Sequence, residues 1–269
     1  RGALRGWGSI IGNWGGYDVS GLIGEANDGG NDYAFIMNGF QQAAALAPLP
    51  KYDKRSAKAI AKWILNVTNA SRMMYWNALP QDKQDSYAWA LANDPEACIP
   101  YESMKEVWGG KTPFATGDAV RGGWAATNLS LYSGSSVGYL AAVVKTTNVP
   151  EILQIDLNKT DFYGHNNLIS YLYFNPTVSS KQVQVNLPSG TFGMYEAITE
   201  IVSQSSYTGS VQLTIPAGEV RLIRFFASGL MPEDREGKLY VGEDILDYHY
   251  QYDYSENLRI KALSTDKNP

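Results

Sequence analysis

The sequence predicts an α+β chain in which a helical portion, residues 1–145, precedes an antiparallel β-sandwich, residues 146–230. Two observations predict this order. Apolar residues recur at helical spacing before about residue 146, and they alternate with polar residues after it. Turn signals rich in proline, glycine and asparagine then separate the alternating runs at the spacing typical of sandwiches. A charged, tyrosine-rich segment over 231–269 follows, which we interpret as a tail or the start of a further β-module.

The composition of the 269 residues excludes several classes of protein. With 44% hydrophobic and 18% charged residues, the chain is typical of a folded globular protein. The net charge of −5 and the lack of a basic cluster argue against nucleic acid as a partner. No apolar run approaches the ~20 residues of a membrane span. One cysteine, Cys98, and two histidines, His165 and His249, supply neither an internal disulfide nor a zinc cluster, so we expect no metal and no cofactor.

The first 30 residues contain ten of the 26 glycines, interleaved with Trp7, Trp14 and Tyr17. Because they show neither the helical nor the strand period, we expect a long structured loop there. The chain begins at Arg1 with neither a methionine nor an apolar leader, and we interpret it as a processed or excised piece.

Two strong helices are expected in the first half. From Asp32 the apolar residues recur at helical spacing up to Ala47, and Pro48 ends the run. Asp53 is placed to cap a second helix from about residue 54 to 75. Weaker helical patterns cover 82–92, 101–107 and 136–145.

Strands are expected wherever apolar and polar residues alternate after residue 146. These runs cover 152–154, 168–174, 183–187, 192–198, 211–215 and 220–222, with one more at 258–263. Turn signals at 175–176, 188–190 and 216–218 separate neighbouring runs, which is typical of an antiparallel sandwich.

The densest group of polar residues is the segment 24–33, which places Glu25, Asp28 and Asp32 beside two glycines. Helix capping and the helix dipole explain one or two of these carboxylates. Crowded carboxylates raise one another's pKa, and glycoside hydrolysis needs one protonated and one ionised carboxyl group. We therefore expect Glu25 and Asp28 to take part in proton transfer, with Asp32 and Tyr33 as substrate-binding neighbours.

A second glycine-rich loop covers 109–123 and ends beside Trp124. It carries Asp118 and Arg121, which a surface ion pair would also explain. Glu102 precedes this loop at an expected helix start, where a favourable first-turn charge is the alternative explanation. We take Glu102 and Asp118 as further catalytic candidates and Arg121 as a substrate-binding candidate.

Four aromatic residues in the glycine-rich loops are candidates for a sugar-binding rim: Trp14, Tyr17, Trp108 and Trp124. Aromatic faces cover the apolar CH faces of pyranose rings, although core packing is the alternative for each residue. The sequence has no phosphate-binding glycine loop and no Gly-x-Ser-x-Gly motif, which argues against nucleotide chemistry and serine hydrolysis.

Four segments, at 24–35, 127–132, 152–157 and 171–176, resemble large secreted bacterial proteins of polysaccharide use. In its organisation the chain is similar to the C-terminal portion of (α/α)-toroid carbohydrate-active enzymes with an appended β-domain. This resemblance implies that residues 1–145 are a toroid-like catalytic portion. A complete ring needs more helices than this sequence offers, so the remainder of the parent chain or another subunit would complete it.

The leading interpretation is a glycoside hydrolase acting on a polysaccharide or oligosaccharide, secreted, periplasmic or on the cell surface of a bacterium. Its carboxylate assignments rest on loop context and not on a family motif. One alternative is a polysaccharide lyase, with Tyr33 or His165 as the base. The other is a non-catalytic carbohydrate-binding module.

Overall fold

The computed structural model describes the chain in several stretches. They are residues 7–10, 13–14, 17–18, 22–25, 33–71, 77, 80–83, 87–93, 103–105, 114–116, 137–162, 164 and 167–254. Before Phe40, the description covers the backbone path and not the side chains.

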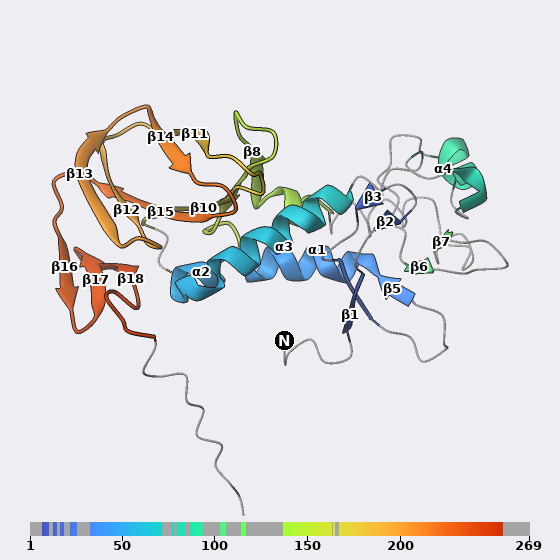
Figure 1. The fold of residues 1–269 in the computed structure, drawn as a ribbon, viewed down its shortest axis with the longest axis horizontal. Helices are drawn as coiled ribbons and strands as arrows, with labels where there is room; N and C mark the ends of the chain where they lie inside the picture. Colours follow the sequence, from blue (N-terminus) through green and yellow to red (C-terminus); the bar gives the residue numbers. More distant parts are fainter. Residues whose placement is uncertain are drawn as a thin grey trace, which may run out of the picture.

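A six-stranded antiparallel sheet forms the centre of the β-rich part, with the strand order β13-β12-β15-β10-β9-β8 (Figure 1). Its strands are β8 (Val144–Thr146), β9 (Leu153–Asp156), β10 (Ile169–Phe174), β12 (Phe192–Glu196), β13 (Ile201–Tyr207) and β15 (Val220–Ala227). The central strands β10 and β15 are covered on both faces, so most of their residues are buried and their sequences are mainly apolar, with Arg221 and Arg224 as the charged residues of β15. This sheet-rich part agrees with the predicted antiparallel β-structure.

One face of this sheet is covered by a strand pair, β11 (Lys181–Asn186) and β14 (Ser210–Ile215). Buried and exposed residues alternate along both strands, because only one side of the pair meets the sheet. Val183 and Leu213 lie opposite each other in the pair, and both pack with Phe225 of β15. The two layers thus enclose an apolar core of their own.

The other face of the sheet is covered by helices. They are α1 (Ile36–Leu46), α2 (Leu49–Tyr52), the 3₁₀ helix η2 (Lys54–Ser56) and α3 (Ala57–Ala70). Figure 1 shows α1 and α3 side by side below the sheet, on the side away from β11 and β14. Phe40 of α1 and Ile64 of α3 are fully buried in a core that also includes Leu172 and Leu222 of the sheet. The helices and the sheet therefore share an apolar interface.

The two predicted strong helices are confirmed, with shorter bounds. Alanines at 43, 44 and 47 are fully buried, and these small side chains let α1 pack closely against α3. The side chain of Asp53 accepts a hydrogen bond from the backbone N–H of Arg55 at 3.1 Å, so the predicted cap is present. It caps the 3₁₀ turn η2, and the α-helix itself begins at Ala57.

A three-stranded antiparallel sheet follows the sandwich. Its strands are β16 (Pro232–Arg235), β17 (Lys238–Val241) and β18 (Asp244–Asp247). Glu236 and Gly237 join β16 to β17 with φ values of 55° and 77°, the positive values that a two-residue type I′ hairpin turn requires.

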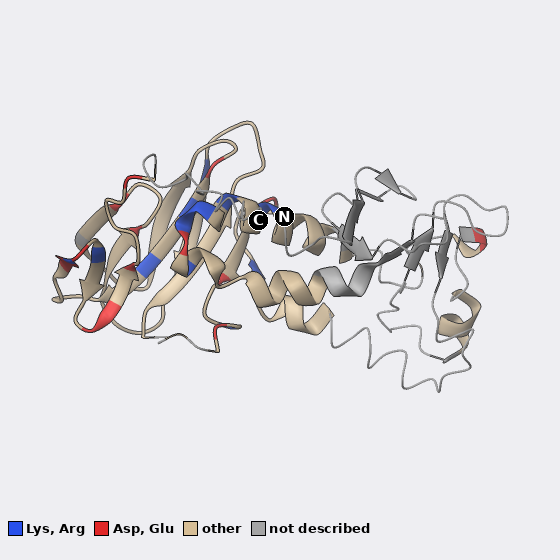
Figure 2. Ribbon diagram, turned by 90° about the horizontal axis from the view of Figure 1, so that it is seen from below, with Lys and Arg blue, Asp and Glu red and all other residues tan. Residues whose placement is uncertain are grey.

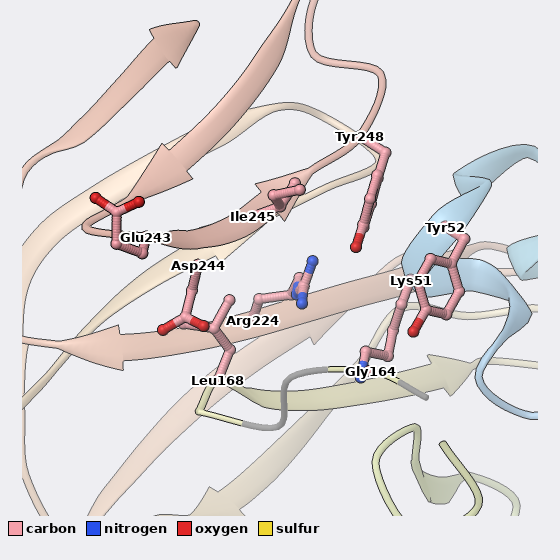
Figure 3. A pocket seen from close by; sticks show the side chains of 9 residues that line it. All are labelled: Lys51, Tyr52, Gly164, Leu168, Arg224, Glu243, Asp244, Ile245 and Tyr248. Carbon is pink, nitrogen blue, oxygen red and sulfur yellow. The ribbon is translucent and has the colours of Figure 1, made fainter. Parts of the chain in front are cut away.

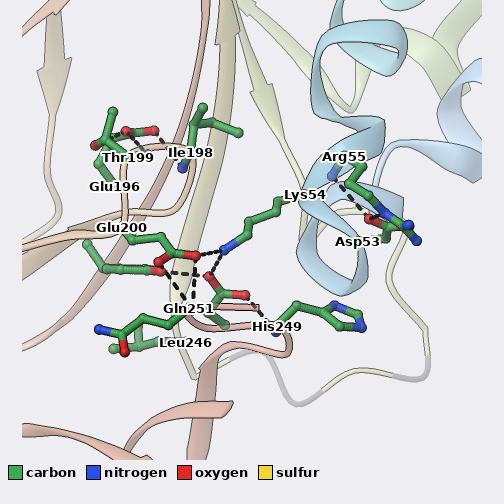
Figure 4. Close-up of polar contacts among 12 residues, drawn as sticks. Asp53, Lys54, Arg55, Glu196, Ile198, Thr199, Glu200, Leu246, His249 and Gln251 are labelled. Atoms are coloured by element: carbon green, nitrogen blue, oxygen red, sulfur yellow. Dashed lines mark hydrogen bonds and ion pairs between the residues drawn. The ribbon is translucent and has the colours of Figure 1, made fainter. Parts of the chain in front are cut away.

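Polar contacts fix this C-terminal sheet to the helices and to β12 (Figure 4). Lys54 forms ion pairs with Glu200 and, at 2.7 Å, with Asp247 at the end of β18. The hydroxyl of Tyr195 in β12 donates a second hydrogen bond to Asp247, at 2.6 Å. Glu200 in turn accepts the backbone N–H of Gln251. Three segments that are distant in sequence therefore meet at Lys54.

The N-terminal segment differs from the predicted loop. It contains the antiparallel pair β1 (Trp7–Ile10) and β4 (Leu22–Glu25), and the short hairpin β2 (Asn13–Trp14) and β3 (Tyr17–Asp18). The sequence signal failed because strands of two to four residues are too short to show a period and glycines interrupt the pattern. Pairing with a partner strand decides this structure.

The predicted helix at 101–107 is wrong. Ser103–Lys105 forms strand β6, which pairs with β5 (Tyr33–Phe35) on one side and β7 (Phe114–Thr116) on the other. A short segment with a weak helical pattern takes the conformation that its neighbours can pair with. The predicted helix at 136–145 also ends early, at residue 141, because Val144–Thr146 pairs with β9 as β8.

Among the described residues of the first half, the remaining helical elements are η4 (Gln81–Lys83), α4 (Tyr87–Asn93) and the short helix at 137–141. A helical toroid is not seen in this described part. Figure 2 shows basic and acidic residues interspersed over the β-rich part, whereas α1 carries no charge. None of the described helices is long and apolar enough to cross a membrane.

Candidate functional site

The structure places some of the predicted site residues on strands. Glu25 ends β4 opposite Trp7, and Tyr33 begins β5 opposite Lys105. Trp14 and Tyr17 are backbone partners in the β2–β3 hairpin, which brings together two residues predicted to bind sugar. Their side chains lie outside the described part. Fully outside the described residues are Asp28, Asp32, Glu102, Trp108, Asp118, Arg121, Trp124 and His165. Their roles stay predictions.

The described part contains a groove that sequence reasoning did not single out, where α1, α2 and the turn after β9 meet. It has a volume of about 390 Å³. Its lining residues are Ala45, Leu46, Pro48, Leu49, Tyr52, Tyr139, Thr160, Asp161 and Phe162, and we call it the aromatic groove. Phe162 is 77% exposed there, and Leu46 and Leu49 are each at least 40% exposed. Such a concentration of exposed apolar side chains is typical of a binding surface.

A buried ion pair supports the base of the aromatic groove. Lys51 Nζ lies 2.5 Å from Asp161 Oδ2, and the side chains are 3% and 4% exposed. Lys51 also donates a hydrogen bond to Asn158 Oδ1 at 2.8 Å. The pair joins α2 to the turn after β9, across 110 residues of sequence.

Asp161 also accepts hydrogen bonds from Tyr52 OH at 2.8 Å and from the backbone N–H of Gly164 at 3.0 Å. A side chain at position 164 would collide with Asp161 and Tyr52, so the close approach requires glycine. Burial disfavours the charged form of Asp161, but the hydrogen bonds from Lys51 and Tyr52 outweigh it and hold the pKa of Asp161 below its usual value. Asp161 is therefore ionised at neutral pH.

The two partners of Asp161 have shifted pKa values of their own. Burial lowers the pKa of Lys51, although Asp161 opposes this shift. Burial, together with the hydrogen bond to the Asp161 carboxylate, raises the pKa of Tyr52 well above its usual value. The Tyr52 phenol therefore stays protonated at neutral pH, where it donates a hydrogen bond and does not act as a base.

The aromatic groove is suited to binding rather than to acid/base catalysis. Among the described residues that line it, Asp161 alone carries a carboxylate, and this group is already paired with Lys51. Glycoside hydrolysis requires two carboxyl groups. The described part of the chain also contains no group of three or more His, Cys, Asp or Glu residues that could hold a metal ion.

Comparisons with known proteins give limited matches. No family model matches this chain, and no curated protein matches it. Among solved structures, the chain is similar to α-galactosidase I from Mortierella vinacea, with 15% identity and a TM-score of 0.24, over 38% of this chain and 28% of that chain. It is also similar to a protein described as an α-N-acetylgalactosaminidase from Bacillus halodurans, with 15% identity and a TM-score of 0.24, over 44% of this chain and 29% of that chain. The likeness thus spans less than a third of either solved chain.

Proposed function

We propose that this chain is part of a carbohydrate-active protein, a secreted, periplasmic or cell-surface glycoside hydrolase, and that the aromatic groove binds a saccharide of its substrate. The observation that carries the proposal is the set of three aromatic side chains, Tyr52, Tyr139 and Phe162, around one ionised carboxylate. Flat aromatic faces suit the apolar CH faces of a sugar ring.

The size of the aromatic groove supports this proposal. Its volume of about 390 Å³ lies within the ~300–1,000 Å³ typical of small-molecule sites. The ion pair between Lys51 and Asp161 anchors the base from two separate segments, so the lining is held in place before a ligand arrives. A preformed site loses less conformational entropy on binding.

The catalytic part of the proposal rests on the sequence. Glu25 and Asp28 are the preferred acid and base, with Glu102 and Asp118 as the next candidates. A helical ring, completed by the parent chain or another subunit, would bring two of these carboxylates together. A separation of ~5–5.5 Å would give retention at the anomeric carbon, and ~6.5–9.5 Å would give inversion.

A non-catalytic carbohydrate-binding module is the second candidate function. It is favoured by the single carboxylate among the described lining residues of the groove. The lyase alternative, with Tyr33 or His165 as the base, stays a prediction, because both of these side chains lie outside the described part.

Both candidate functions, glycoside hydrolase and carbohydrate-binding module, require saccharide binding, so a binding experiment tests them together. Affinity electrophoresis of the full chain in gels containing soluble plant and bacterial polysaccharides should show retardation by at least one of them. Phe162→Ala should weaken this binding about tenfold, because stacking area is lost at an exposed position where folding does not depend on the ring. Ile201→Ala is the matched control, since Ile201 is also an exposed apolar residue, at 60%, and does not line the groove. The proposal would be refuted if no polysaccharide retards the wild-type chain, or if Phe162→Ala binds as tightly as the wild type.

Product analysis separates the two candidates. A hydrolase releases reducing sugars from the bound polysaccharide, and Glu25→Gln or Asp28→Asn in the complete protein should then lower turnover by about 10²-fold or more. A binding module releases none. New ultraviolet absorbance in the products would instead indicate the double bond that a lyase forms.

A further inference from the structure

Arg224 occupies an unusual place in the fold. It lies in the middle of β15 between Leu222 and Phe226, on the face of the sheet that the helices cover. Leu222 and Phe226 point into the apolar core, and Arg224 itself is only 3% exposed. A charged side chain in this position needs a compensating interaction, because removing a charge from water is costly.

The protein compensates this charge only in part. Arg224 Nε donates a hydrogen bond to Ser170 Oγ at 3.2 Å, and Nη1 donates one to the backbone carbonyl of Leu246 at 2.7 Å. Neither acceptor carries a formal charge. Among the described residues, no carboxylate forms an ion pair with Arg224, and the second terminal nitrogen, Nη2, has no acceptor. A guanidinium has five N–H donors, so donors remain available.

A small cavity of about 70 Å³ lies beside the guanidinium. It is lined by Lys51, Tyr52, Gly164, Leu168, Arg224, Glu243, Asp244, Ile245 and Tyr248, and we call it the arginine cavity. Figure 3 shows the guanidinium of Arg224 directed into the space between Tyr248 and Lys51, with the hydroxyl of Tyr248 directed toward it. The volume holds a few water molecules or one small polyatomic ion.

The other charges of the lining do not neutralise Arg224. Lys51 is paired with Asp161. Asp244 accepts a hydrogen bond from the Asn167 side chain at 3.0 Å, and the side chain of Glu243 is 97% exposed. Burial lowers the pKa of Arg224 to about 10, so the group is still positively charged at neutral pH. The nearby charge of Asp247 raises this pKa, but the Asp247 carboxylate is itself bonded to Lys54 and to Tyr195. Among the described residues, the buried cation of the arginine cavity therefore has no anion in ion-pair contact.

We propose that the arginine cavity binds the carboxylate group of a small ligand, with Arg224 as the main binding residue and the Tyr248 hydroxyl as an additional donor. The planar fork of a guanidinium matches the two oxygens of a carboxylate, and a hydrogen bond between two charged groups is stronger than one between neutral groups. The ligand supplies the negative charge that the described residues do not. This proposal does not depend on saccharide binding in the aromatic groove.

Isothermal titration of the full chain with sodium acetate, at constant ionic strength maintained with sodium chloride, tests the proposal. We expect saturable binding of acetate by the wild-type chain and at least a tenfold loss in Arg224→Met. Arg221→Met is the matched control, because Arg221 lies on the same strand, three residues away and on the opposite face, and does not line the cavity. It should bind acetate as the wild type does. Asp244→Asn should bind acetate more tightly, since a nearby negative charge is removed.

Several results would overturn the proposal. These are the absence of saturable acetate binding, equal binding by Arg224→Met, or an equal loss in Arg221→Met. Sodium sulfate binding as tightly as acetate would show that the cavity does not select carboxylates. If circular dichroism shows that Arg224→Met does not fold, Ile245→Trp fills the cavity and leaves Arg224 in place. Acetate binding retained in that variant would equally refute the assignment.

Discussion

The two faces of the six-stranded sheet have different chemistry. Between the sheet and the β11–β14 pair, the core consists of aliphatic and aromatic side chains such as Val183, Ile215 and Phe225. The face under the helices and the C-terminal sheet also buries ionisable residues, among them Lys51, Asp161, Arg224 and Asp247. The first face is covered by one antiparallel pair of strands, β11 and β14, whereas the second is covered by segments from three parts of the chain. Buried polar groups gather where separate segments meet, and the aromatic groove and the arginine cavity lie there.

The largest effects are expected from substitutions that create a cavity in the core on each face of the sheet. Phe225→Ala should destabilise the chain by about 3–5 kcal/mol, because Phe225 is fully buried and packs edge-on against Tyr171. Phe226→Ala, on the other face of the same strand, should cost a similar free energy of unfolding. Urea denaturation followed by circular dichroism measures both. A much smaller loss in Phe226→Ala would show that the helices cover their face less tightly.

Among the polar contacts of the helix-covered face, the buried ion pair between Lys51 and Asp161 should give the largest loss of stability when it is broken. Asp161→Asn should destabilise the chain by about 3 kcal/mol, because it leaves the Lys51 ammonium buried without a counter-charge. The double variant Lys51→Met with Asp161→Leu should recover much of this loss, since no charge is then left unpaired. Denaturation midpoints of the single and double variants test this. A double variant no more stable than Asp161→Asn would indicate that the pair acts mainly through its hydrogen bonds to neighbours.

The same carboxylate should make stability depend on pH. The pKa of Asp161 is lower in the folded chain than in the unfolded chain, where it is about 3.9. Its contribution is therefore fully present above about pH 4–5 and is lost as the pH falls through the folded pKa. Unfolding midpoints measured from pH 7 to pH 2 should fall less steeply for Asp161→Asn than for the wild type. If the midpoints of Asp161→Asn and of the wild type fall equally steeply with pH, other carboxylates cause the loss of stability in acid.

An exposed ion pair provides the smallest expected effect. Lys58 on α3 lies 3.4 Å from Glu219, and both side chains are 51% exposed. Lys58→Ala should change the free energy of unfolding by less than about 0.5 kcal/mol, because water and salt screen exposed charges. Thermal unfolding at low and high salt should give nearly the same midpoint for this variant and the wild type. A loss comparable to that of Asp161→Asn would remove the distinction between buried and exposed pairs.

Parts of the candidate sites had signals in the sequence. Arg224 interrupts the apolar run from Leu222 to Phe226, which marks a charge in a strand that is otherwise buried. Phe162 follows Asp161 in a connection between two strands, where an exposed aromatic residue is available to a ligand. The predicted catalytic residues came instead from the density of carboxylates and glycines, and their side chains lie outside the described part.

The sequence by itself determined the elements whose residues carry their own local signal. Alternation predicts β11 and β14 closely, and helical spacing with Pro48 and Asp53 as boundaries predicts α1 and α3. Only the tertiary structure decided that Ser103–Lys105 is a strand and that Lys51 meets Asp161. Periodicity reflects which side of one element is buried, and it is therefore local. Strand partners and buried charge pairs depend on residues outside the local segment, 110 positions away in the case of Lys51 and Asp161, and no local pattern contains that information.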